Sequence, residues 1–158
     1  MTGVQTCALP ISPRSFRFRP AVNRRWAAIK QQLADSGAEL LLHGGDLTRD
    51  GEIHEFEYRQ ARDDLDTLPF PTFIIPGNMD VGNKHTTKAG TMREWDDVSL
   101  NMTAERLDLF ASYFGPAHWS FLHKNVRFTG FFAAVAGTGF RQEEQLWHLL
   151  EKDRKSVV

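Results

Sequence analysis

The chain has 158 residues, of which 41% are hydrophobic and 25% charged, and its formal net charge is −1. This length suffices for one domain with a buried core. The charge balance gives no indication of nucleic-acid binding, and no apolar run reaches the roughly 18 residues of a membrane span. The only cysteine, Cys7, excludes an internal disulfide and a thiolate-rich zinc site, which fits a cytoplasmic location. No oligomeric state is favoured.

The two ends lack the patterns of a folded domain. Residues 1–12, "MTGVQTCALPIS", have neither helical nor strand periodicity and resemble translated sequencing-adapter sequence, as do residues 153–158, "DRKSVV". The first segment also lacks the basic and apolar regions of a secretory signal peptide. We therefore expect residues 13–152 to form an incomplete domain between non-native tails, without its first strand and its C-terminal part.

From residue 20 onward, apolar residues alternate between helical and strand patterns. The first predicted helix begins at Pro20, has apolar residues at helical spacing, and ends near Gly37. Two short buried strands are predicted at 38–45, "AELLLHGG", and at 71–78, "PTFIIPGN". Between them lies a predicted helix with the inward residues Ile53, Phe56, Ala61, Leu65 and Leu68. This order predicts an α/β domain with parallel strands joined by crossover helices.

The second half begins with a stretch, 77–101, that has no clear periodicity. A helix is then predicted from Leu107, Phe110 and Phe114. Two strands, 118–123 and 126–137, follow it and are joined by a tight turn, and a last helix begins near residue 142. The glycines of "GTG" at 137–139 are expected to turn the chain, because the full glycine pattern of a phosphate-binding loop is lacking.

Polar residues stand where the two predicted strands end. Asp46 follows the first strand in "HGGDL", and Asn78 follows the second in "PGNMD". Ligands gather beyond the carboxyl ends of parallel strands, so both side chains are expected at one edge of the sheet. A carboxylate and an amide oxygen are hard ligands suited to a divalent cation. Residues of this kind also serve as turn and helix-cap residues, so a purely structural role stays open.

These two motifs and the segments after residue 117 resemble the calcineurin-like metallophosphoesterase family over about residues 20–152. The resemblance implies an α/β/β/α sandwich that hydrolyses phosphomonoesters or phosphodiesters with two divalent metal ions, Mn, Fe or Zn. It implies that Asp46 bridges the two metals, that Asn78 is a ligand of the second, and that Asp80 orients the histidine of the motif.

Three departures from the family pattern bear on activity. Met79 occupies the position of the family's histidine, and a thioether has no proton to give to a leaving group. Loss of such an acid costs about 10²–10⁴ in rate. The family's first D-x-H motif and its later histidine motifs are also absent from the chain. Met79 is either a true substitution or a sequence error. We expect this chain to be inactive as it stands, and the alternative is a non-catalytic α/β pseudo-phosphoesterase or binding module.

The histidines offer no clear replacement for the missing ligands. His85 lies in the long aperiodic stretch, and a polar residue in such a loop is usually solvated and not catalytic. His43 is expected to pack or hydrogen-bond locally at the end of its strand. The remaining four histidines have no metal-ligand spacing such as HExxH.

Overall fold

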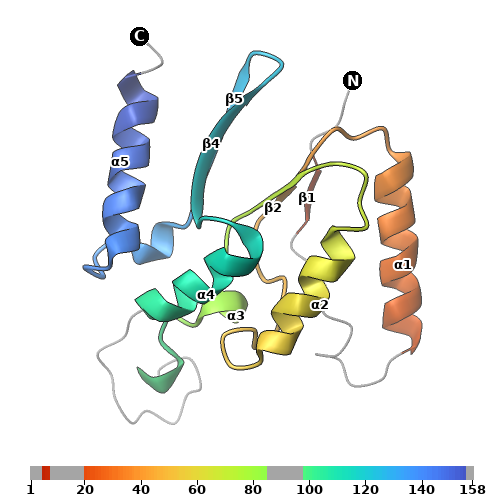
Figure 1. Cartoon of the computed structure of the whole chain (residues 1–158), viewed down its shortest axis with the longest axis horizontal. Coiled ribbons are helices and arrows are strands. Elements are labelled where there is room, and N and C mark those ends of the chain that lie inside the picture. Colours follow the sequence, from red (N-terminus) through yellow and green to blue (C-terminus); the bar gives the residue numbers. More distant parts are fainter. Residues whose placement is uncertain (1–4, 8–19, 85–97, 156–158) are drawn as a thin grey trace.

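The computed structural model describes residues 5–7, 20–84 and 98–155, with side chains from residue 24 onward. Two small sheets are surrounded by helices, and Figure 1 shows α1 and α5 at opposite sides of the molecule. The helices are α1 (Pro20–Asp35), α2 (Glu55–Leu65), α3 (Asn78–Val81), α4 (Ala104–Phe114) and α5 (Arg141–Lys155). The strands are β1 (Gln5–Cys7), β2 (Leu41–His43), β3 (Thr72–Ile74), β4 (His118–His123) and β5 (Val126–Phe131). The predicted α/β class is confirmed.

The first sheet is parallel and has the order β1-β2-β3. Leu41 pairs with Thr72, and His43 pairs with Ile74, while α2 is the crossover between the two strands. This is the predicted strand–helix–strand unit. Because both strands end at the same edge, the segments that follow them meet there.

The structure differs from the prediction at the other edge of β2. A domain without its first strand would leave this edge of β2 open, but β1 lies parallel to it, with Gln5 opposite Leu41 and Cys7 opposite His43. Strand pairing joins backbone groups, so a segment with no strand pattern can cover an open edge. The proposed domain boundaries at residues 13 and 152 stay a prediction, although Asp153 accepts a hydrogen bond from Ser120 on β4.

The core lies between the first sheet, α2 and α4. The buried face of α2 consists of Glu57, Tyr58, Ala61 and Leu65. The prediction that Ile53 and Phe56 belong to this face is wrong: their exposed fractions are 54% and 39%. The helix begins only at Glu55, and its inward stripe passes through Tyr58, whose ring lies edge-on to Phe110 and Phe114 of α4.

The second sheet is the antiparallel hairpin β4–β5, turned as predicted at Lys124 and Asn125, which have positive φ angles of 48° and 64°. The second strand is shorter than predicted, because a 3₁₀ turn (Ala133–Val135) follows Phe131 after one residue. The indole N–H of Trp119 on β4 donates to the carbonyl oxygen of Ile74 at 2.8 Å, which links the two sheets.

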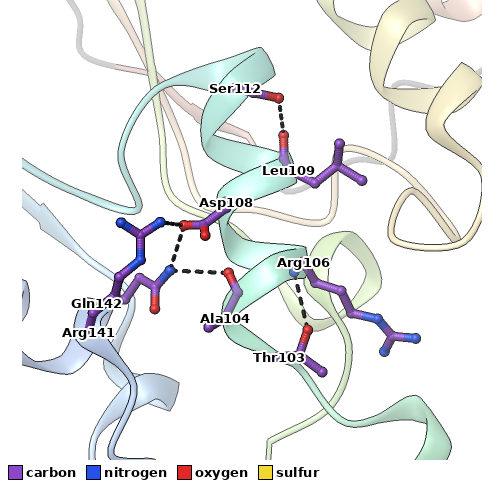
Figure 2. Close-up of polar contacts among 8 residues, drawn as sticks. All are labelled: Thr103, Ala104, Arg106, Asp108, Leu109, Ser112, Arg141 and Gln142. Carbon is purple, nitrogen blue, oxygen red and sulfur yellow. Dashed lines mark hydrogen bonds and ion pairs between the residues drawn. The ribbon is translucent and has the colours of Figure 1, made fainter.

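Two features fix α4 against the start of α5 (Figure 2). Arg141 forms an ion pair with Asp108 on α4. The amide nitrogen of Gln142 donates to the carboxylate of Asp108 at 2.8 Å and to the carbonyl oxygen of Ala104 at 3.2 Å. These contacts hold the start of α5 against the first half of α4.

Thr103 is the N-cap residue of α4, and its hydroxyl oxygen accepts a hydrogen bond from the Arg106 backbone N–H at 3.2 Å (Figure 2). We expect Thr103→Ala to lower the free energy of unfolding by about 1 kcal/mol, measured by urea denaturation. Ser112→Ala on the same helix is the control. The Ser112 hydroxyl is exposed and bonds only a carbonyl within the helix, so the change should stay within about 0.5 kcal/mol. Equal losses in both variants would contradict a capping role.

Candidate functional site

The segment after β2 lies directly against the segment after β3. Gly45 has a positive φ of 97°, and a Cβ at this position would lie 2.4 Å from the backbone nitrogen of Gly77. Asp46 follows with a positive φ of 57°, and its Oδ1 accepts a hydrogen bond from the Met79 backbone N–H at 3.1 Å. A Cβ on Gly77 would lie 2.1 Å from that same oxygen. The two exits can approach this closely only because both positions lack a side chain.

Asp80 links the segment after β2 to the segment after β3 through hydrogen bonds. Its side chain is fully buried, and one carboxylate oxygen accepts hydrogen bonds from the backbone N–H and the hydroxyl of Thr48 at 2.8 and 2.9 Å. The other oxygen accepts one from the Gly77 N–H at 2.9 Å. Burial raises the pKa of Asp80 to about 6, although these donors favour the charged form. Asp80 is thus a positioning residue that ties the two loops together.

Tyr58 supports this arrangement from α2. Its ring is fully buried, and its hydroxyl donates a hydrogen bond to the backbone carbonyl of Asp80. Burial holds the pKa of Tyr58 well above its usual range. The buried face of α2 therefore contributes to the shape of the site as well as to the core.

Asn78 and Met79 lie at the surface above this junction. The Asn78 amide nitrogen donates to the side-chain oxygen of Asn83 at 3.3 Å, a bond that does not use the Asn78 amide oxygen. The Met79 side chain is 37% exposed. Both residues line a hollow of about 320 Å³. Its lining residues are Arg49, Asp50, Glu52, Asn78, Met79, Gly82, Asn83 and Leu100.

Two residues of this region, Thr48 and Glu52, were not predicted from the sequence. Thr48 gives the Asp80 carboxylate two of its hydrogen bonds, and Glu52 lines the hollow. Thr48 lies two residues after Asp46, in the same loop, so this position next to a candidate ligand was a usable signal. Nothing in the local sequence distinguishes Glu52 from an exposed loop residue, since its surroundings come from distant segments.

Asp46 and Asn78 suit two positions of a divalent metal site, since a carboxylate and an amide are hard oxygen ligands. Within residues 24–84 and 98–155, no group of three or more His, Cys, Asp or Glu side chains could hold an ion. A pair of metal ions needs more protein ligands than these two. The described residues alone therefore do not complete a metal site.

His43, His118 and His123 each make local structural contacts. His43 is buried, and its Nδ1 accepts a hydrogen bond from the Gly45 N–H at 3.2 Å, as expected for local bonding. His118 packs against α5 with its Nε2 at 3.0 Å from the Gln142 carbonyl, and burial lowers its pKa. His123 contacts Glu39 at 2.6 Å. The prediction for His85 lies outside the described residues.

The "GTG" loop before α5 has the turning role that was predicted. Gly137 and Gly139 have positive φ angles of 82° and 72°. Their backbone N–H groups donate to the Glu143 carboxylate at 2.7 and 2.8 Å. These donors lower the pKa of Glu143. A carboxylate of the chain itself thus occupies the position that a bound anion would need.

A family model of calcineurin-like phosphoesterases matches residues 20–157. The chain belongs to this family. The resemblance inferred from the two strand-exit motifs is therefore confirmed. No curated protein and no solved structure matches the chain significantly.

The calcineurin-like phosphoesterases are hydrolases that act on phosphoesters and generally depend on divalent metal ions. In this phosphoesterase domain, the segments that follow β2 and β3 contact each other through Asp46, Gly77 and Met79. In the described ranges, no helix has the length and apolar character that a membrane crossing requires.

Proposed function

We propose that this domain hydrolyses phosphomonoesters or phosphodiesters at a dinuclear metal site, and that Asp46 and Asn78 are ligands of that site. Asp46 would contribute a carboxylate that both ions could share, and Asn78 would contribute its amide oxygen. The observation that carries the proposal is the contact between the two strand exits, where Asp46 accepts from the Met79 N–H at 3.1 Å. This contact holds α3, which begins at Asn78, against Asp46 at the edge where ligands of parallel sheets bind.

Bound divalent ions supply two things to such a reaction: they activate water and they neutralise the charge that develops on the phosphoryl oxygens. Mn, Fe and Zn all suit this chemistry. The remaining ligands come from outside the described part of the chain. With only two ligands on the described residues, the 158-residue chain is proposed to bind metal weakly and to be inactive as it stands.

Calorimetric titration with Mn²⁺ tests the metal ligands. We expect weak binding by the 158-residue chain and a loss of at least about tenfold in affinity in Asp46→Asn, because the amide removes the shared negative charge. Asp108→Asn is the control, since Asp108 is a carboxylate of α4 engaged with Arg141 and lies outside the hollow. Tight binding at two sites by this chain would contradict the proposed ligand deficit.

The activity itself is tested with bis(p-nitrophenyl) phosphate and Mn²⁺. We expect hydrolysis by the chain extended with the residues that flank it in its genomic reading frame, and loss of that hydrolysis in Asp46→Asn. Activity that is unchanged in Asp46→Asn would refute the assignment of the site.

A non-catalytic binding module is the second candidate, and Met79 is the observation that favours it. An exposed thioether stands in the hollow where the resemblance implies an ionisable side chain. In this case the extended chain would bind Mn²⁺ and a phosphoester analogue without hydrolysing the nitrophenyl diester.

A further inference from the structure

Glu52 shares the hollow with the two residues that follow the second strand exit. It lies on the loop between β2 and α2, while Asn78 and Met79 belong to α3. The three side chains line the same space of about 320 Å³. An acidic group therefore lies within the same cavity as the thioether that stands in place of the expected proton donor.

One carboxyl oxygen of Glu52 is shielded from solvent and makes no hydrogen bond with the described part of the chain. A buried carboxylate oxygen without a donor is unfavourable, so this environment favours the protonated acid. Burial raises the pKa of Glu52 to about 7. The carboxyl group thus keeps a proton near neutral pH, which an ordinary glutamic acid loses.

The surrounding charges act on Glu52 in opposite directions. Asp50 on the same loop and Asp80 on α3 raise its pKa, whereas Arg106 on α4 lowers it. The charge of Glu52 in turn raises the pKa of Tyr58 on α2, and Arg49 lines the hollow. A hydrogen bond from the Glu52 backbone N–H also lowers the pKa, and burial outweighs both this bond and the charge of Arg106.

We propose that Glu52 is the proton donor to the leaving oxygen of a phosphoester bound in this hollow, in place of the acid that Met79 cannot supply. This role rests on the proposed phosphoesterase function. A water oxygen attacks phosphorus, and the bond between phosphorus and the leaving oxygen breaks with its electron pair on that oxygen. The leaving oxygen takes the Glu52 proton and departs as an alcohol. The water proton passes to solvent, and the Glu52 carboxylate is reprotonated from solvent.

Two physical properties suit Glu52 to this role. A general acid is most effective when its pKa is near the working pH, and about 7 meets that condition. The terminal torsion of glutamate is broad and roughly two-fold, so the proton can be presented on either oxygen without a change of rotamer in the rest of the side chain. Met79 lacks any acidic proton.

Two measurements test the proposal, both on the chain extended with the residues that flank it in its genomic reading frame, which is also the background of every other hydrolysis assay. In the first, carbon NMR follows the Glu52 carboxyl group through a pH titration, with and without phenylphosphonate as a non-hydrolysable phosphoester analogue. We expect titration near pH 7 and a shift of the resonance when phenylphosphonate is added. Titration in the range of ordinary glutamates, or no response to phenylphosphonate, would overturn the proposal whether or not the chain is active.

The second measurement compares hydrolysis of diphenyl phosphate, which has a poor leaving group, with bis(p-nitrophenyl) phosphate in the presence of Mn²⁺. Glu52→Gln is expected to slow the phenyl ester by about 10²–10⁴ and the nitrophenyl ester by less than about tenfold, because only phenolate needs protonation. The fall of kcat/KM above pH 7 should disappear as well. Glu144→Gln, a change of an exposed carboxylate on α5, should leave both rates unchanged.

The outcomes separate the two claims. Equal slowing of both esters by Glu52→Gln would overturn the proton-donor role and leave the phosphoesterase function standing. If no form hydrolyses either ester, the phosphoesterase function fails, and the response of Glu52 to phenylphosphonate still decides whether the hollow receives phosphoesters. Glu52→Asp keeps an acid of nearly the same size, so its phenyl-ester rate should exceed that of Glu52→Gln.

Discussion

Replacing Gly77 by alanine is expected to destabilise the fold by about 3 kcal/mol, because the new methyl group would meet atoms that cannot move away. The added Cβ would lie 2.1 Å from the Asp46 carboxylate oxygen and 2.5 Å from the Asp46 backbone nitrogen. A rotation of the Asp46 side chain would relieve only the first of these contacts. The φ of Gly77 is −103°, which any residue adopts, so the effect is steric.

Gly44→Ala is the matched control for this substitution. Gly44 stands at the exit of the other strand, is exposed, and would have no atom within 4 Å of an added Cβ. We expect a change within about 0.5 kcal/mol, which urea denaturation of both variants measures. If the two glycine variants lose equal stability, the close contact between the strand exits is wrong. Gly77→Ala should also weaken Mn²⁺ binding, since it displaces Asp46.

The parts of the fold that were predictable depend on local sequence. Consecutive apolar residues such as Leu40 and Leu41 indicate a buried strand, and the glycines after them indicate a sharp exit. The hairpin turn at Lys124 and Asn125 and the inward face of α4 are local in the same sense. For this reason Asp46 and Asn78 could be assigned to one edge of the sheet before the structure was known.

The parts that could not be predicted depend on contacts between distant segments. The pairing of Gln5–Cys7 with β2 joins backbone groups and has no signature in the side chains. Asn83 pairs with Asn101 across a long stretch of chain, and this bridge helps to form the hollow. The burial that raises the pKa of Glu52 arises from that assembly, so Glu52 has no local signal in the sequence.

Asp80 illustrates how a motif residue can have a structural role that its motif does not suggest. The resemblance implies that this carboxylate orients the side chain of residue 79. Its carboxylate oxygens accept hydrogen bonds from Thr48 and Gly77, and the side chain of Met79 has no N–H or O–H that it could donate to Asp80. The hydrogen bonds of Asp80 to Thr48 and Gly77 therefore form without a histidine at position 79. A histidine introduced at position 79 would therefore enter a preformed backbone, held by the hydrogen bond from residue 79 N–H to Asp46.

In the Glu52→Gln background, Met79→His should accelerate hydrolysis of diphenyl phosphate by about 10²–10⁴, because an imidazolium supplies the proton that the glutamine cannot give. In the wild-type background the gain should be below about tenfold, since Glu52 already provides that proton. The measurement is the ratio of phenyl-ester to nitrophenyl-ester rates with Mn²⁺ in each variant.

Met79→Gln is the matched control, because glutamine has a similar size and can form hydrogen bonds but has no proton to release near neutral pH. It should restore nothing in the Glu52→Gln background. If Met79→His gives the same large gain in both backgrounds, Glu52 donates no proton and position 79 alone limits the rate. The size of the gain in the wild type therefore distinguishes two cases. In the first, the domain has no general acid; in the second, Glu52 on the loop before α2 serves as the acid in place of residue 79 on α3.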